Sequence, residues 1–401
     1  MTARIQIPAR PLAVLATIAV AIAAGGCGRA KSADQGSSDG PRMGVKGTAE
    51  DAAADLGFPA IATKNTTRVA GADAIADAAA VTRAVYPGGS PLSLPEAVAL
   101  VDVGDWRTAL VAASLNHAPI NAPTLFTRGS SMPPATSKAL TALAPRGSKA
   151  AGGAQVVRVG TTARPGALKT TDIRGANPFA LARSVDAFVS AARGGAGRRV
   201  LLVSAENPAF AAPAAAYAAK SGDPILFTNK DAVPPDTIAA IKAHDKPTIY
   251  ILGPSSVITP KVTRQLKGLG RIVRTGGADP VANSIEFARF SDGGFGWGIV
   301  DPGHGMVFLP QDADPTVAAA AAPLSASGAY GPALLLSSPT ALDKAIAAFL
   351  LDIQPGYAKD PVRGVYNRGW LIGDTTAIAP ALQSAIDRNL EITRIASKGA
   401  G

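Results

Sequence analysis

The chain has 401 residues and a formal net charge of +10, and 47% of its residues are apolar although only 5% are aromatic. This length is enough to bury the cores of two or three domains, and the single cysteine excludes an intramolecular disulfide. Alanine supplies much of the apolar content, which predicts many close contacts between helices. The basic balance favours an anionic partner. Nucleic acid is not an expected partner, because no basic stripe alternates with aromatic residues.

The N-terminus has the layout of a secretory signal peptide. Arginines precede an apolar run over residues 12–22, which is too short to cross a bilayer because crossing takes about 20 residues. Small residues then lead to Cys27, as in a bacterial lipobox, although Ala24 stands where that motif prefers leucine. We therefore predict a signal peptide over residues 1–27 with lipid on Cys27, which would attach the protein to a membrane. An ordinary signal peptide with an incidental cysteine is the alternative.

Residues 28–65 are interpreted as a flexible linker. The stretch Gly36-Ser37-Ser38-Asp39-Gly40-Pro41 is typical of turns and linkers, and the segment lacks hydrophobic periodicity. Such a linker would hold a globular body away from the membrane surface.

Beyond the linker the sequence repeats itself three times. Gly71-Ala72-Asp73 recurs as Gly175-Ala176-Asn177 and as Gly277-Ala278-Asp279, at spacings of 104 and 102 residues. Other landmarks keep the same order, among them the proline-led stretches at residues 123–127 and 224–228. The period exceeds the 20–50 residues of a solenoid repeat, so each unit is the size of a domain. We predict repeats over residues 66–168, 169–269 and 270–398, the last with insertions.

The second unit shows the expected fold class. Short apolar runs at residues 199–204, 224–228 and 248–252 are typical of buried parallel strands. Helical stretches at residues 209–220 and 235–243 separate them. Alternating strands and helices predict an α/β fold in which each repeat has a mostly parallel sheet flanked by helices.

The repeated Gly-Ala-Asp/Asn tips precede a predicted helix each time. One interpretation is structural: a glycine turn followed by an N-capping side chain. Another is that the helix N-termini and nearby arginines bind an anionic ligand. The candidate ligand-binding residues are Arg68, Gly71, Asp73, Arg174, Gly175, Asn177, Arg274, Gly277 and Asp279.

These landmarks resemble the cell wall-binding repeat 2 family of bacterial surface proteins, whose units open with an Arg-x-x-Gly-Ala-Asp tip. Residues 68–73 and 274–279 carry that tip, and the proline-led strands and the strand-ending Gly253 and Gly373 carry the rest. The chain resembles a divergent member of that family, because Pro178 and other residues replace the Arg-Tyr that often follows the tip. The resemblance implies a three-lobed body that binds an anionic wall polymer without catalysis.

Catalytic and metal-binding patterns are not found in the sequence, so no enzyme activity, cofactor or metal is expected. His117, His244 and His304 belong to no metal-ligand or catalytic motif. The cluster Asp301-Pro302-Gly303-His304-Gly305 is interpreted as a turn. The glycine-rich stretch at residues 294–298 is interpreted as a flexible loop, and its Trp297 as a packing residue rather than a sugar platform.

The sequence therefore predicts an exported, lipid-anchored envelope protein on the outer face of the cytoplasmic membrane, facing the wall. Its expected role is non-catalytic binding of an anionic cell-wall or surface polymer. A periplasmic-type lipoprotein that binds a small solute is one alternative, and a wall-modifying enzyme is another.

Overall fold

The computed structural model describes residues 61–88, 93–326 and 331–395. The predicted signal peptide, Cys27 and residues 28–60 of the predicted linker lie outside the described residues. Residues 61–65, the last of the predicted linker, begin the described fold with a short strand. No helix within the described ranges is long and apolar enough to cross a membrane.

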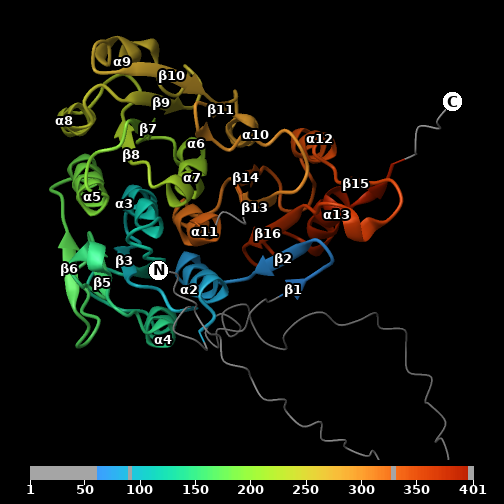
Figure 1. Cartoon of the computed structure of the whole chain (residues 1–401), viewed down its shortest axis with the longest axis horizontal. Helices are drawn as coiled ribbons and strands as arrows, with labels where there is room; N and C mark the ends of the chain where they lie inside the picture. Colours follow the sequence, from blue (N-terminus) through green and yellow to red (C-terminus); the bar gives the residue numbers. More distant parts are fainter. Residues whose placement is uncertain (1–60, 89–92, 327–330, 396–401) are drawn as a thin grey trace, which may run out of the picture. The chain divides into compact units, whose positions relative to one another are not determined.

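Three sheets organise the body, and Figure 1 shows them in three groups of elements. In the first lobe the strand order is β4 (Thr124–Thr127), β3 (Val98–Asp102), β5 (Val156–Val159), β6 (Thr170–Ile173). In the second lobe it is β8 (Ile225–Thr228), β7 (Arg199–Ser204), β9 (Thr248–Leu252), β10 (Arg271–Thr275). In the third lobe it is β14 (Ala333–Leu336), β13 (Gly305–Pro310), β16 (Arg368–Ile372), β2 (Thr66–Val69), β1 (Ile61–Ala62).

Neighbouring strands in these sheets are parallel, apart from the short β1 beside β2. In the first sheet Val98 and Leu100 pack on one face, while Ala99 and Val101 join the main core on the other. Burial on both faces explains why the strands read as continuous apolar runs. The predicted α/β fold with parallel sheets flanked by helices is confirmed.

The sheets are offset from the sequence repeats by one strand. The strands that open the second and third repeats, β6 and β10, complete the sheets of the preceding lobes. By the same rule β2, which opens the first repeat, pairs with β16 in the third lobe, where Arg68 lies opposite Leu371. The helix that follows each tip packs on its own lobe instead: α2 (Ala74–Val85), α5 (Pro178–Ala192) and α10 (Pro280–Arg289). Each predicted repeat therefore contributes to two lobes.

Small residues fill the junction where the lobes meet. Each lobe sends its first crossover helix there: α3 (Trp106–Ala112) with η2 (Ala113–Asn116), α7 (Pro213–Ser221) and α11 (Thr316–Ala326). Helix α11 packs against α7, α2, α3 and η2. Ala215 and Ala320 are fully buried at this junction. The predicted close contacts between alanine-rich helices are confirmed.

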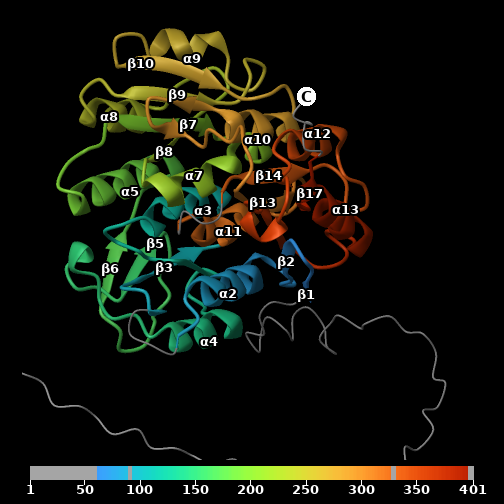
Figure 2. The same cartoon turned by 45° about the vertical axis from the view of Figure 1, so that its right-hand side comes forward.

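Outer helices and short elements complete the lobes. The helices are α4 (Pro134–Leu143), α6 (Pro208–Ala211), α8 (Pro235–Ala243), α9 (Pro260–Gln265), α12 (Lys344–Asp352) and α13 (Pro380–Leu390), with 3-10 turns η3 (Lys149–Ala151) and η4 (Pro361–Arg363). Short strands β15 (Gly356–Tyr357) and β17 (Thr393–Arg394) pair with each other. Figure 2 shows β10, β9, β7 and β8 as neighbouring strands of the second sheet, with α5 and α7 below them.

The glycine-rich insertion is a hairpin rather than a flexible loop. Strands β11 (Ser291–Asp292) and β12 (Phe295–Gly296) are joined by two glycines with positive φ, as a tight hairpin turn requires. Phe295 stacks on Tyr250 with ring centroids 3.5 Å apart, and Trp297 meets Tyr217 edge-on. This aromatic packing, which sequence periodicity did not reveal, attaches the hairpin to the second lobe. The interpretation of Trp297 as a packing residue is confirmed.

Enlarging an alanine at the junction should destabilise the fold. Ala320→Leu adds three carbons where the helices leave no space, so we expect the free energy of unfolding to fall by about 1–3 kcal/mol in urea titration. The matched control is Ala187→Leu on the exposed face of α5, which should change the free energy by less than about 0.5 kcal/mol. Equal effects of the two substitutions would contradict close packing at the junction.

Candidate functional site

The three tips are helix caps at the carboxyl ends of parallel strands. Asp73 accepts a hydrogen bond from the Ala76 amide at 2.9 Å, and Asn177 accepts one from the Ala180 amide at the same distance. Asp279 caps α10 in the same way. The capping interpretation of the tips is confirmed, because each side chain satisfies an amide that the helix leaves unpaired.

Each tip glycine lies against the helix that follows it. A Cβ atom on Gly71 would lie 2.5 Å from the Asp77 amide nitrogen, and one on Gly175 would lie 2.2 Å from the Leu181 amide nitrogen. On Gly277 it would lie 2.4 Å from the Ala282 carbonyl carbon. Only glycine permits this approach, so its recurrence has a structural cause in every repeat.

Arg68 is enclosed by protein groups. Its side chain is fully buried, and its guanidinium donates to Gln383 Oε1 and to the carbonyl oxygens of Gly373, Asp374 and Ile378 at 2.6–3.0 Å. Burial lowers the pKa of Arg68 to about 10, so the group stays charged at neutral pH. This geometry favours a structural role for Arg68, because no donor remains directed toward solvent.

Arg274 occupies the equivalent place in the second lobe. It donates to the carbonyl oxygens of Gly253 and Ile258 at 2.6 and 2.8 Å, and burial lowers its pKa. In both lobes the arginine therefore holds the loop after the third strand of the sheet.

In the first lobe an arginine also holds the loop after the third strand, but it lies on the third strand itself instead of the fourth. Asp172 stands at the strand position that Arg68 and Arg274 occupy, and its cross-strand partner is Arg158. Arg158 donates to both carboxylate oxygens of Asp172, at 2.6 and 2.8 Å, and to the Ala163 carbonyl oxygen at 3.0 Å. The hydrogen bonds from Arg158 hold the pKa of Asp172 below its usual value. Arg158 was not a sequence candidate, because the sequence does not show strand register.

Arg174 is the exposed arginine of the three tips. Its side chain is 69% exposed, and it pairs with Asp172 at 2.7 Å. The carboxylate of Asp73 also has a partner, Arg128, at 2.8 Å. The structure does not gather Arg68, Arg174 and Arg274 into one cluster. Arg68 and Arg274 lie in the sheets of the third and second lobes, and Arg174 directly follows β6 of the first. Ligand contact by the tip residues stays a prediction.

One histidine forms a buried ion pair that the sequence did not indicate. His244 Nε2 lies 2.9 Å from Asp186 Oδ2, and its Nδ1 lies 2.7 Å from the Gly197 carbonyl oxygen. Burial lowers the pKa of His244, but the hydrogen bond to Asp186 and its negative charge raise it more, and the net shift is upward. His304 pairs with Asp301 near the surface. No group of three metal-ligating side chains occurs among the described residues.

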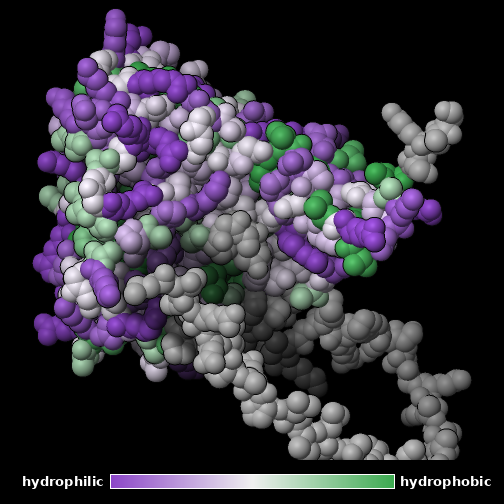
Figure 3. Space-filling model, in the orientation of Figure 1, coloured by the Kyte–Doolittle hydropathy of each residue, from purple (hydrophilic) through white to green (hydrophobic). Residues whose placement is uncertain are grey.

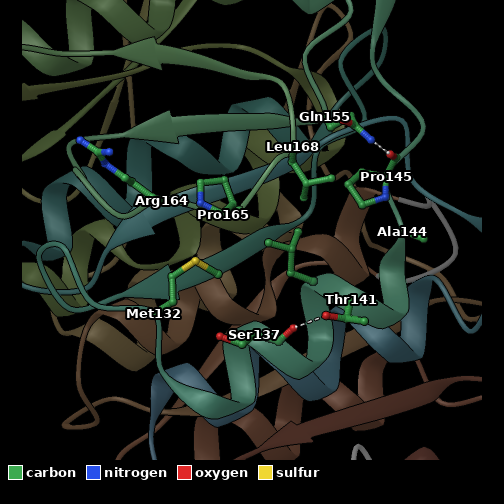
Figure 4. Close-up of a pocket in the computed structure, with 11 residues that line it drawn as sticks. Met132, Ser137, Thr141, Ala144, Pro145, Gln155, Arg164, Pro165 and Leu168 are labelled. Atoms are coloured by element: carbon green, nitrogen blue, oxygen red, sulfur yellow. Dashed lines mark hydrogen bonds between the residues drawn. The ribbon is translucent and has the colours of Figure 1, made fainter.

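A groove of about 640 Å³ opens on the first lobe beside α4, as Figure 4 shows. Apolar side chains form most of its wall, together with a few polar ones. It is lined by Met132, Ser137, Leu140, Thr141, Ala144, Pro145, Gln155, Arg164, Pro165, Gly166 and Leu168. The amide of Gln155 is engaged by the Pro145 carbonyl oxygen at 2.8 Å. With Arg164 as its one charged lining residue, this groove does not suit a strongly anionic ligand.

The groove exists because the first lobe lacks a helix that the other lobes have. Helix α9 follows the third strand of the second sheet, and its Gln265 accepts a hydrogen bond from the Val233 amide. Helix α13 likewise packs beside α12 in the third lobe. In the first lobe residues 160–169 connect β5 to β6 without a described helix. The space beside α4 therefore stays open.

The surface differs between lobes. Figure 3 shows hydrophilic side chains over much of the visible face, and hydrophobic ones among them on the third lobe. The exposed large apolar residues of the described chain all belong to that lobe's repeat, and they are Val300, Leu351, Val362, Val365 and Ile395.

Replacing Arg68 should destabilise the fold rather than affect one contact on the surface. Arg68→Leu leaves three carbonyl oxygens without their donor, two of them in buried hydrogen bonds, so we expect the free energy of unfolding to fall by more than about 3 kcal/mol. Arg174→Leu is the matched control and should change it by less than about 0.5 kcal/mol, because that side chain is exposed. A small loss for Arg68→Leu would argue against the structural role.

The His244 pair should make stability depend on pH. The folded pKa of His244 is raised above the ordinary value of 6.5, so the pair's contribution is fully present below pH 6.5 and is lost as pH rises through the folded pKa. Urea titrations across this range should show the loss, and Asp186→Asn should remove it. His304→Gln, which changes a partly exposed pair, is the control. An unchanged pH dependence in Asp186→Asn would contradict this origin.

Comparison with known protein families finds a match for part of the chain. Residues 173–263 match the family model Cell wall binding domain 2 (CWB2). No curated protein matches the chain.

Among solved structures, Cwp6 from Clostridium difficile is similar, with a TM-score of 0.65 and 16% identity, over 83% of this chain and 50% of that chain. Cwp8 from Clostridium difficile is similar with a TM-score of 0.61 and 16% identity, over 82% of this chain and 52% of that chain. The chain thus spans about half the length of these structures, and at this identity the likeness shows the fold. The resemblance indicated by the repeated tips is confirmed over residues 173–263, which match the Cell wall binding domain 2 family.

Proposed function

We propose that the protein is an exported, lipid-anchored envelope protein that binds an anionic cell-wall or surface polymer without catalysis. The match of residues 173–263 to a cell wall binding domain carries this proposal. The net charge of +10 supports an anionic partner, because opposite charge raises both the rate and the strength of association. The match to a cell wall binding domain also supports a location at the cell envelope.

The described residues support binding over catalysis. Both ring nitrogens of His244 are occupied, one by Asp186 and the other by the Gly197 carbonyl oxygen, and the surface pair of His304 and Asp301 lies in a turn. The loops at the carboxyl ends of the strands are occupied by capping side chains and by arginines that hold backbone carbonyls. This arrangement supports the proposal of binding without catalysis.

Binding to purified cell walls should weaken as salt rises. The full chain, kept in mild detergent, is mixed with walls and sedimented across a salt series. We expect the bound fraction to fall steeply between 0.1 and 1 M salt, because the screening length shortens from about 10 Å to about 3 Å. Walls stripped of their anionic polymers are the control and should retain little protein. Equal binding to intact and stripped walls at every salt concentration would contradict the proposed ligand.

Anchoring is tested separately at Cys27. Cys27→Ser removes the sulfur that would carry the lipid, so we expect the variant to move from the membrane pellet to the soluble fraction of disrupted cells. Mass spectrometry of the mature N-terminus checks whether lipid is present on the unchanged chain. A variant that stays in the membrane pellet with a cleaved N-terminus would refute the lipid anchor and leave the wall-binding proposal intact.

A further inference from the structure

A basic pocket lies at the amino-terminal ends of strands in the second lobe. Its volume is about 430 Å³, and it is bounded by the starts of β7, β9 and β10 and by the β11–β12 hairpin, which Figure 1 shows beside β9 and β10. Four arginines and two aspartates line it: Arg193, Arg198, Arg199, Arg271, Asp223 and Asp292. We call it the arginine pocket. Its formal charge is positive, since the guanidinium groups outnumber the carboxylates.

Three of the four arginine side chains have hydrogen-bond or ion-pair partners in the protein, and the fourth has none among the described residues. Arg271 pairs with Asp292 at 2.9 Å, and Arg199 donates to the Gly294 carbonyl oxygen at 2.9 Å. Arg193 donates to the carbonyl oxygens that end the α7 segment. The exposed Arg198 side chain makes no hydrogen bond or ion pair with the residues that the structure describes. The pocket therefore presents at least one uncommitted guanidinium beside three that are fixed in place.

A buried carboxylate lines the same pocket. Asp223 is 4% exposed, and burial raises its pKa. Arg199 Nε lies 3.2 Å from its Oδ2, within ion-pair distance, but Oδ2 accepts no hydrogen bond from the described residues. Beside the Arg199 charge, the Asp223 carboxylate keeps acceptor capacity for a ligand hydroxyl.

The arginine pocket is a feature of this lobe and not of the fold in general. The strands of the other two sheets that correspond to β7 are β3 and β13. They start with Val98 and Gly305, whereas β7 starts with Arg199. The hairpin that supplies Asp292 and the glycine wall comes from the insertion of the third repeat. Tyr250, stacked on Phe295 of the hairpin, donates to Asp292 Oδ2 at 3.1 Å and so joins the two parts.

We propose that the arginine pocket binds a sugar or polyol unit that carries an acidic group, either phosphate or carboxylate. Guanidinium groups bind such anions with charge-assisted, often paired hydrogen bonds, and Arg198 is the one free to turn toward them. The Asp223 carboxylate accepts a ligand hydroxyl. That this unit belongs to a wall polymer rests on the proposed function, whereas the pocket's chemistry does not.

Small ligands test the pocket directly on the full chain. Glucose 6-phosphate, glucuronate, glucose and inorganic phosphate are titrated by calorimetry. We expect one of the two acidic sugars to bind at least about tenfold more tightly than glucose, because only the acidic sugars engage the arginines. The preferred acid identifies phosphate or carboxylate as the recognised group. Failure of both acidic sugars to bind at millimolar concentration would overturn the proposal.

Variants assign the contacts. Arg198→Gln should weaken binding of the acidic sugar at least about tenfold, and it should not affect folding, because the side chain has no partner among the described residues. Arg183→Gln, an exposed arginine elsewhere on the second lobe, is the matched control and should leave binding unchanged. Asp223→Asn should weaken the acidic sugar more than inorganic phosphate. Equal effects of Arg198→Gln and Arg183→Gln would overturn the site.

Wall sedimentation in parallel separates the two proposals. If the acidic sugars fail to bind while salt-sensitive wall binding persists, the pocket proposal is wrong and the proposed function stands. If the acidic sugars bind through Arg198 while walls are not bound, the pocket proposal stands and the proposed function is wrong.

Discussion

Close packing of alanine-rich helices is the constraint on which the body depends. Three parallel sheets can share one core only if their first crossover helices approach closely, and α7 and α11 do so because their contact faces carry almost no side-chain bulk. Interiors packed to this density transmit small changes in volume. The low aromatic content of the chain therefore follows from its architecture. The aromatic cluster at the β11–β12 hairpin reaches the junction helices through Tyr217 of α7.

The three tips fix how each strand end is joined to the helix that follows it. A glycine lets the strand end lie against the next helix, and a capping side chain fixes where that helix starts. A guanidinium then holds the neighbouring loop by its carbonyl oxygens in every lobe, from Arg68 or Arg274 on the fourth strand or from Arg158 on the third. Exchange of the arginine between strands preserves the contact while changing the sequence motif, which explains the departure of the second tip from the other two.

Much of this could be predicted from the sequence, since apolar runs and asparagine or aspartate before proline depend on local chemistry. The fold class and the caps of α5 and α10 are of this kind. The role of Arg68 could not be predicted, because Arg-x-x-Gly reads the same whether the guanidinium meets a ligand or distant carbonyls. The arginine pocket could not be predicted from the sequence either, because strand register and a hairpin contact bring Arg198, Arg271 and Asp292 together.

Closure of the third sheet by β2 ties the beginning of the described fold to its end. Arg68 makes its hydrogen bonds with residues more than 300 positions later in the chain. Such long-range pairing slows folding, because a very large loop must close before the contact is gained. During synthesis β2 stays an unpaired edge, able to pair wrongly, until β16 has been made. The body is therefore expected to reach its native state late and as a unit, so that loss of its last lobe would also expose its first strand.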